Sequence, residues 1–266
     1  MRVVLKRVRY TLAPMGTSAS NGVQFYPASD QSLLVYFGPQ ENPRSSCAEA
    51  TGLGLPTQNQ ITTEGHESVR RLLQLMELEP IAGVRNLHPA YCSLLIKFDA
   101  LKLRHEELEE ILRGYVVRME KMVLPVPRLV EIPVCYGGEY GPDLKDVAEL
   151  HGITTERVIE LHATTTYTTY FLGFAPGFAY LGQLPEALAT PRLALPRKFV
   201  PIGSVGIAGR QTGVYPISTP GGWRLLGRTP LAMFRLEREE MSLLSIGDRV
   251  QFVPISREQF AKLENA

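Results

Sequence analysis

Residues 203–230 read GSVGIAGRQTGVYPISTPGGWRLLGRTP, and this stretch decides the fold class. It lies within a longer segment, residues 164–236, that holds 10 glycines, 8 prolines and 10 of the chain's 22 aromatic residues. Glycine and proline at that density exclude long helices, whereas the aromatic content excludes a disordered linker. Short aromatic or β-branched runs between turn-forming residues predict many short strands, and therefore a β-barrel or a β-sandwich.

The charge of this segment differs from that of the rest of the chain. Residues 164–236 carry seven basic side chains and one acidic side chain, Glu186, which gives a local net charge of +6. The whole chain has 28 Lys and Arg against 27 Asp and Glu, a net charge of +1. That balance excludes the general basic excess of a nucleic-acid-binding protein. The local positive charge suits a small carboxylate or phosphate ligand.

Cysteine content and hydropathy exclude further classes. The three cysteines (Cys47, Cys92 and Cys135) are odd in number and form no CxxC, which argues against a disulfide scaffold or a zinc ribbon. No stretch approaches the roughly 18 apolar residues that a membrane span requires. Charges interrupt the basic N-terminus, MRVVLKRVRYTLAP, before an apolar signal core can form. We expect a soluble cytoplasmic protein without membrane or nucleic-acid partners.

The first half of the chain shows helical periodicity between short strands. Strands are expected near residues 23–26, 33–37, 83–87 and 91–98, and apolar spacing predicts helices between Thr63 and Pro80 and over Leu108–Met119. Residues 38–60 are polar and rich in turn-formers, and we expect an exposed, mobile loop there. The predicted fold class is α+β, with an N-terminal α/β domain at residues 1–126 and a β-barrel domain at residues 127–266.

The glycine-rich stretch 203–213 is the first candidate for a binding site. A loop with glycines at this spacing can present backbone N–H groups to an anion, and the side chains that follow Gly209 add donors. The simpler interpretation is that the glycines serve tight turns of a barrel. The stretch is not a P-loop, because no Gly-Lys-Ser/Thr follows, and it is not a GxGxxG motif.

Two further clusters and one histidine complete the predicted site. Residues 218–230 combine a Pro-Gly-Gly turn with two arginines suited to bidentate recognition of carboxylate or phosphate, although the tryptophan there can equally anchor a core. Residues 171–182, FLGFAPGFAYLG, can line a pocket or form a barrel corner. His162 lies on the apolar face of a predicted helix and is either an acid–base group or a core residue.

We therefore predict one small-anion site made by the two glycine-rich stretches, with Arg210 and Arg228 as cationic donors and no metal. His162 and Tyr180 are the candidates for proton transfer. Asp143, in YGGEYGPDL, is interpreted as a residue at a helix start that accepts backbone N–H groups. The predicted anion-binding residues are Gly209, Arg210, Gln211, Thr212, Gly213, Gly221, Gly222, Trp223, Arg228 and Thr229.

Five segments in fixed order resemble one protein family. The sequence is similar to the family that contains the B subunit of 5-oxoprolinase, the sporulation kinase A inhibitor and allophanate hydrolase subunit 1, which is related to half of a carboxyltransferase region. Two departures are Ala175, where the family usually has Leu, and Arg210, where Asn is common. The segments are YGGEYGPDL (136–144), ERVIELH (156–162), LGFAPGFAYLG (172–182), PRLALPRKFVPIGSVGIAGRQTGVYP (191–216) and TPGGWRLLGRTP (219–230).

The resemblance implies a fold, a function and partners. The fold is a small N-terminal α/β domain followed by a cyclophilin-like β-barrel. The function is that of the B subunit in an ATP-dependent 5-oxoprolinase, which opens 5-oxoproline to glutamate together with the A and C subunits, with ATP and Mg supplied in the complex and no biotin on this chain. The alternatives are a non-catalytic histidine-kinase inhibitor and half of a urea- or allophanate-type carboxyltransferase.

Overall fold

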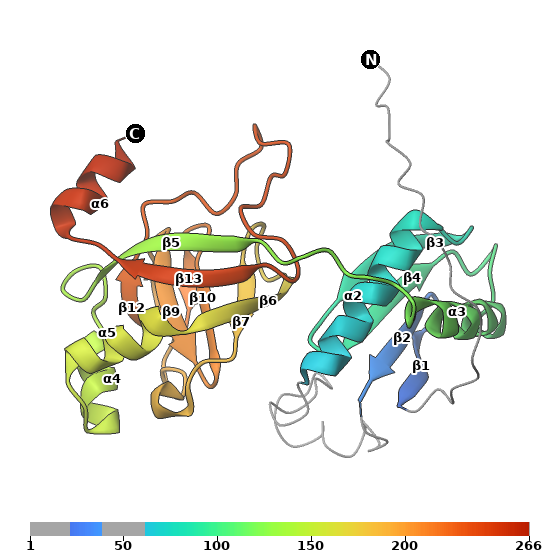
Figure 1. Cartoon of the computed structure of the whole chain (residues 1–266), viewed down its shortest axis with the longest axis horizontal. Helices are drawn as coiled ribbons and strands as arrows, with labels where there is room; N and C mark the ends of the chain where they lie inside the picture. The colour runs from blue at the N-terminus through green and yellow to red at the C-terminus, as the bar shows by residue number, and fades with distance from the viewer. Residues whose placement is uncertain (1–21, 39–61, 266) are drawn as a thin grey trace. The chain divides into compact units, whose positions relative to one another are not determined.

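The computed structural model describes residues 22–38 and 62–265, and these fall into two compact units that meet between Pro125 and Val126. Apart from Gly38, the loop expected at residues 38–60 lies outside the described residues. None of the helices described is long and apolar enough to cross a membrane. The confirmed fold class is α+β, and each unit is described by itself below (Figure 1).

The first unit is an antiparallel four-stranded sheet packed with two helices. The sheet order is β1-β2-β4-β3, formed by Val23–Ser29, Ser32–Phe37, Ser93–Phe98 and Val84–Pro89. Helix α2 (Thr63–Leu78) begins where the side chain of Thr62 accepts the Gly65 N–H, and helix α3 is His105–Met119. The two predicted helices are thus confirmed.

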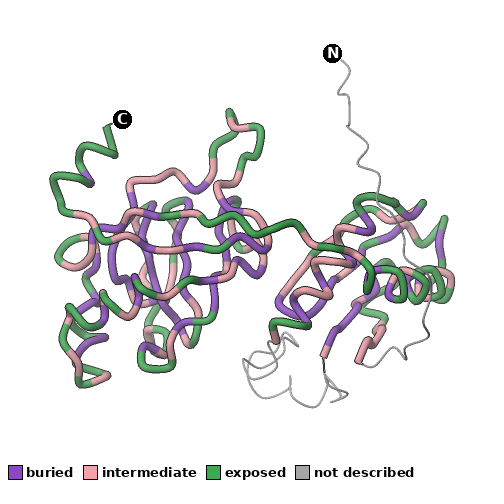
Figure 2. Tube along the Cα trace, viewed as in Figure 1, coloured by how far each residue is buried: buried purple, intermediate pink, exposed green. Residues whose placement is uncertain are grey.

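The core of this unit follows from the two periodicities of its elements. Alternate residues of the central strands, such as Leu33 and Ile96, are buried together with α2 and α3 residues at helical spacing, such as Leu72 and Leu112 (Figure 2). Successive side chains of a strand point to opposite faces, so only one face of this sheet packs on the helices.

The second unit is a closed barrel, seven-stranded within the described residues, in the order β10-β7-β6-β13-β5-β12-β9. Strands β5 and β13 run parallel and the other neighbours antiparallel. Of the two architectures that the sequence allowed, the barrel is therefore the observed one. Its strands are β5 (Leu129–Tyr136), β6 (Thr166–Leu172), β7 (Ala179–Gly182), β9 (Ser204–Ala208), β10 (Gln211–Val214), β12 (Arg224–Arg228) and β13 (Arg249–Pro254).

Short helices and a ribbon surround the barrel. Helices α4 (Leu144–His151) and α5 (Thr155–Thr164) join β5 to β6, and α6 (Arg257–Glu264) ends the chain. A 3-10 turn, η2, spans Glu186–Leu188. Strands β8 (Arg197–Val200) and β11 (Thr219–Gly221) pair only with each other among the described strands, as a two-stranded ribbon.

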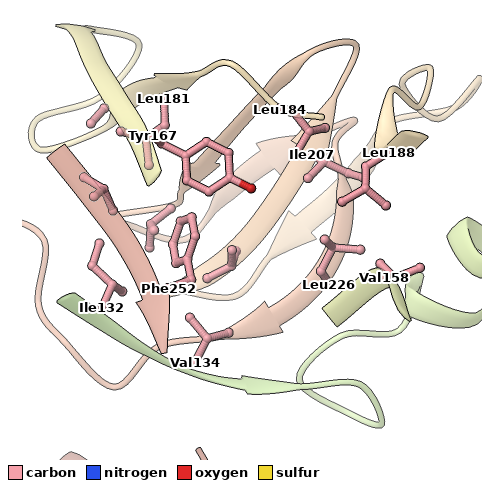
Figure 3. Close-up of a cluster of buried hydrophobic side chains, with 14 of the residues drawn as sticks. Ile132, Val134, Val158, Tyr167, Leu181, Leu184, Leu188, Ile207, Leu226 and Phe252 are labelled. Carbon is pink, nitrogen blue, oxygen red and sulfur yellow. The ribbon is translucent and has the colours of Figure 1, made fainter. Parts of the chain in front are cut away.

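Side chains fill the barrel. Ile132, Tyr167, Ile207 and Phe252 come from four different strands and converge on one interior cluster (Figure 3). A barrel of this size has an interior wide enough for side chains alone, so it is a packed core and not a channel.

The glycines of the stretch 203–213 have structural roles in this barrel. Gly209, at φ 54°, is the first of the two residues that join β9 to β10, and a positive φ at that position is what a type II′ hairpin turn requires. Gly203 also has a positive φ, 78°, and a Cβ there would lie 2.3 Å from the backbone oxygen of Thr229. The interpretation of these glycines as turn residues is confirmed.

The first prediction concerns Gly203, with Gly114 as its control. Gly203→Ala should lower the free energy of unfolding by at least about 2 kcal/mol, because it adds a left-handed strain and a clash with backbone. Gly114→Ala should raise it by about 0.5–1 kcal/mol, because Gly114 lies inside α3 and an added Cβ there would have no atom within 4 Å. Urea denaturation of both variants measures these changes. Equal effects of the two substitutions would contradict the packing described here.

Candidate functional site

An aromatic cluster on the outer face of the barrel is the centre of the candidate site. Phe178 makes edge contacts with the rings of Tyr180, Tyr215 and Trp223 at centroid distances of 5.0, 5.6 and 5.6 Å. Phe171 stacks on Tyr180 at 4.4 Å. Such edge and stacked pairs add to the burial of apolar area and hold the rings in fixed orientations.

Strand alternation explains why these side chains lie outside. Leu181 pairs with Thr212 across β7 and β10, and both side chains are buried, Leu181 in the interior cluster. Their strand neighbours Tyr180, Gln211 and Gly213 therefore face outward. A Cβ on Gly213 would lie 3.2 Å from the Phe178 ring and 3.3 Å from the Trp223 ring, so this glycine lets the aromatic cluster lie directly on the strand.

A short segment before β8 joins the two glycine-rich stretches. The Gly209 N–H donates to the Thr190 oxygen at 2.7 Å, and the Leu193 N–H donates to the Gly222 oxygen at 2.8 Å. Arg192 lies between these two anchors and is exposed. Burial raises the pKa of the Tyr180 and Tyr215 hydroxyls, and the positive charge of Arg192 opposes that rise at both. The Arg192 guanidinium is thus close enough to both phenols for its charge to act on their pKa values.

Eight of the predicted residues lie around this segment and the aromatic cluster. Arg210 is exposed at the tip of the β9–β10 turn, and its carbonyl accepts the Leu184 N–H at 2.9 Å. Gly221 lies against Tyr215, since a Cβ there would be 2.5 Å from the Tyr215 hydroxyl. The eight are Tyr180, Gly209, Arg210, Gln211, Gly213, Gly221, Gly222 and Trp223.

Arg228 and Thr229 do not belong to this group, so the structure does not bring Arg210 and Arg228 together as the two cationic donors of one site. Strand β12 runs antiparallel to β9, with Arg224 opposite Ile207 and Arg228 opposite Ser204. Arg228 is therefore at the end of β9 that lies away from the Gly209–Arg210 turn. Its Nε donates to the Ile202 oxygen at 2.7 Å, and its guanidinium lies over the Phe260 ring at 5.8 Å.

His162 and Thr212 lie on the inner side of the wall, in one hydrogen-bonded chain. The Thr212 hydroxyl donates to the Gly206 oxygen at 3.0 Å, so its oxygen accepts from His162 Nε2, at 2.9 Å. His162 Nδ1 then accepts from the Tyr136 hydroxyl, at 2.7 Å. This assigns the neutral Nε2–H tautomer. The imidazole also stacks on Phe252 at 4.5 Å.

This geometry corrects the proton-transfer role predicted for His162. The residue is 0% exposed, both ring nitrogens are occupied, and burial lowers its pKa to about 3. Tyr180 is on the opposite face of the barrel wall, so the two predicted acid–base groups do not meet. His162 is a satisfied core residue. Thr212 likewise uses its hydroxyl inside the barrel, so it offers no side-chain donor to an anion outside.

Asp143 also differs from its predicted role. It occupies the position before α4 but makes no side-chain hydrogen bond to that helix. Its carboxylate instead accepts the Leu225 N–H at 2.6 Å and pairs with Arg197 Nη2 at 2.6 Å. With an exposed fraction of 4% for its side chain, Asp143 fastens β8 and β12 to the start of α4.

Two members of the site, Arg192 and Tyr215, were not predicted from the sequence. Both stand in the segment PRLALPRKFVPIGSVGIAGRQTGVYP, but neither belongs to a spacing pattern that indicates function. Their signal is tertiary, because only the contact of residues 190–193 with Gly209 and Gly222 brings Arg192 to the aromatic cluster.

The side chains described do not fit a metal–nucleotide site. No group of three or more His, Cys, Asp or Glu in residues 22–38 and 62–265 could hold a metal ion. The sequence also has no P-loop. The outer-face site instead offers the Arg192 guanidinium, the Gln211 carboxamide and the half-buried rings of Phe171 and Tyr180, which can bind and orient a small planar carboxylate.

The sequence and structure were compared with known proteins. Residues 43–244 match the family described as carboxyltransferase domain, subdomain C and D. Over 203 residues the chain is 44% identical to the 5-oxoprolinase B subunit of Bacillus subtilis (strain 168), covering 70% of this chain and 81% of that relative. Over 209 residues it is 43% identical to the 5-oxoprolinase B subunit of Escherichia coli O157:H7, covering 77% and 92%.

A solved structure shares the fold. The crystal structure of TTHA0988 superposes with a TM-score of 0.65 at 38% identity and covers 74% of this chain. The superposition covers only 38% of that chain, so this protein spans well under half the length of its structural relative.

The second prediction is an acid sensitivity that His162 causes. Its folded-state pKa of about 3 is below the unfolded value of about 6.5, so between these pH values only the unfolded chain takes up the proton. The stabilisation is complete above pH 6.5 and is lost as pH falls toward 3, by up to about 1.4 kcal/mol per pH unit. Chemical denaturation at pH 7 and pH 5 should show a loss about 2 kcal/mol smaller in His162→Gln than in the parent. An equal loss in both proteins would contradict a buried neutral imidazole.

Proposed function

We propose that this chain, which belongs to the family of carboxyltransferase domains, subdomain C and D, acts as the B subunit of a 5-oxoprolinase. The observation that carries the proposal is the 43–44% identity to two proteins that bear this name, over more than four fifths of each. The complex would open 5-oxoproline to glutamate with hydrolysis of ATP, as the sequence resemblance implies. The A and C subunits of the enzyme are the expected partners.

The outer-face site would bind the substrate. 5-Oxoproline is a small planar lactam with one carboxylate. Arg192 offers a guanidinium for the carboxylate, and the half-buried rings of Phe171 and Tyr180 offer apolar surface for the lactam ring. The Gln211 side chain, on the same outer face, can donate to the lactam oxygen or accept from its N–H.

Amide opening needs a polarised carbonyl and an activated attacking group. The role of this chain is to bind and orient the lactam, and Tyr180 is the side chain at the site that can hold or donate a proton. ATP would polarise the carbonyl as a phosphate donor. Because the side chains of residues 22–38 and 62–265 do not fit a Mg–ATP site, the other subunits would bind ATP.

A carboxyltransferase activity is the second candidate, because the family description names that reaction. In that case the same site would take urea or a similar amide, and a biotin-carrying protein would supply the carboxyl group. The kinase-inhibitor alternative has no observation in its favour among the described residues.

The third prediction tests the function. The purified full-length chain, mixed with the A and C subunits of a 5-oxoprolinase, should release glutamate from 5-oxoproline in an ATP-dependent manner. The chain alone should show negligible turnover, because its described side chains do not form a Mg–ATP site. Robust turnover by the chain alone, or none by the mixture, would overturn the proposal. Carboxylation of urea by a mixture with a biotinylated carrier would favour the second candidate.

The fourth prediction tests the site. Arg192→Ala should raise the KM for 5-oxoproline about tenfold in the assembled enzyme, as expected for the loss of one charge-assisted hydrogen bond. Arg228→Ala is the matched control, because it removes the same charge at the other end of the barrel. It should leave KM unchanged and lower the melting temperature. A raised KM in Arg228→Ala alone would restore the site predicted from the sequence.

A further inference from the structure

Four large apolar side chains are exposed on and beside the β8–β11 ribbon. Leu195 is 85% exposed, Phe199 64%, Ile202 47% and Ile217 44%. Solvent contacts more than half of Leu195 and Phe199 and nearly half of Ile202 and Ile217, so these residues leave much apolar area unburied. Grouped exposed apolar residues are typical of surfaces that bind another molecule.

The register of the ribbon brings these residues together. Val200 pairs with Thr219, so Ile202 and Ile217, each two residues further along, lie opposite one another beyond the end of the ribbon. Phe199 is on β8 itself. Leu195 precedes β8 by two residues, where the Leu193 N–H still bonds to the Gly222 oxygen at 2.8 Å.

The ribbon is held rigidly from below. Val200 is 0% exposed and belongs to the same buried cluster as Phe178, Tyr215 and Trp223. Arg197 fixes the start of β8 to Asp143 at 2.6 Å. A rigid surface loses little conformational entropy when it binds, which favours its use as an interface.

The charge around the ribbon is of one sign. Residues 187–222 contain four basic residues and no acidic one. Within the described parts of the chain, only Arg197 of the four is paired with a carboxylate. Arg192, Lys198 and Arg210 are exposed. The apolar side chains are therefore bordered by unpaired cations.

From this juxtaposition we propose that the ribbon surface, defined as Leu195, Phe199, Ile202 and Ile217, is the docking site for a second protein of the complex, the 5-oxoprolinase C-type subunit. That protein would present an apolar patch bordered by Asp and Glu. The inference rests on the proposed function for the identity of the partner. Charge complementarity of this kind steers association and excludes wrong partners.

A second copy of this chain is a poor occupant of the ribbon surface. A two-fold interface places the same patch on both sides, so Arg192, Lys198 and Arg210 would face cations of the copy. Strand addition is also disfavoured, because Pro196, Pro201 and Pro220 remove backbone donors along the ribbon. With a second copy and strand addition both disfavoured, the remaining arrangement is side-chain packing of the ribbon surface against an acidic partner protein.

The test compares two matched charge insertions. Leu195→Asp combined with Phe199→Asp should weaken binding of the C-type protein at least about 30-fold, as expected when central apolar contacts are lost. Leu101→Asp is the control, because Leu101 is 97% exposed and lies in the other unit. It should leave the affinity within twofold. Biolayer interferometry with the two purified full-length proteins measures both, and melting curves confirm that the variants are folded.

A charge reversal gives an independent measurement if the double variant fails to fold. Lys198→Glu should slow association about tenfold at low salt, and the difference should shrink at high salt, because steering by exposed charges is screened. Unchanged binding by the folded ribbon variants would overturn the docking site. So would the finding that the unaltered chain is a homodimer and that the ribbon substitutions dissociate it. If the assembled enzyme is active but the ribbon variants bind the C-type protein as tightly as the parent does, this inference alone is refuted. A complex that assembles without 5-oxoprolinase activity refutes the proposed function alone.

Discussion

Strand β9 is buried along its whole length, and the rest of the second unit depends on this two-sided wall. On the inner side, Ile207 packs in the barrel core, and the His162–Thr212 pair donates to the backbone oxygen of Gly206. On the outer side, a Cβ on Gly206 would lie 3.2 Å from the Trp223 side chain. In β9 the inward residues are large and the outward ones small, as in Ser-Val-Gly-Ile-Ala, because Trp223 packs directly on the outer side. Strand alternation also places Tyr180 and Gln211 outside, whereas His162 reaches the inner side from helix α5.

Sequence patterns predicted what depends on local spacing. The helices α2 and α3 follow from apolar periodicity, and the barrel follows from glycine, proline and aromatic density in residues 164–236. The register of the barrel does not follow from such patterns. Arg210 and Arg228 stand in neighbouring glycine-rich stretches, yet the antiparallel pairing of β12 with β9 puts them at opposite ends. The sequence also does not determine on which side of the barrel wall His162 lies, because a histidine on an apolar helix face can be a core residue or can line a site.

The basic residues of segment 164–236 take part in several separate interactions and do not form one site. Arg197 pairs with Asp143 at 2.6 Å, and Arg224 and Arg228 approach Asp146 and Glu264 at 3.6 and 3.9 Å. The first of these pairs is the most buried, and loss of either partner would leave an uncompensated charge in the packed region. The role of Asp143 could not be predicted from its local sequence, because a carboxylate before a helix can either cap that helix or form an ion pair with a residue distant in sequence. The cations left for a ligand or a partner are the exposed ones beside the ribbon.

The proposed site and the ribbon surface are adjacent, so a protein docked on the ribbon would couple substrate binding to assembly. Arg192 is three residues from Leu195, and Val200 belongs to the aromatic cluster that forms the floor of the site. A site on the outer face of a barrel is open to water on one side, whereas amide opening is favoured where water is excluded. A protein docked on the ribbon would supply the missing wall. If the docked protein contacts bound substrate, it increases the affinity for substrate by some factor. Thermodynamic linkage then requires that substrate increase the affinity between the two proteins by the same factor. Assembly and substrate binding are then thermodynamically coupled. The β8–β11 ribbon, which holds Trp223 against β9 and β10, takes part in both.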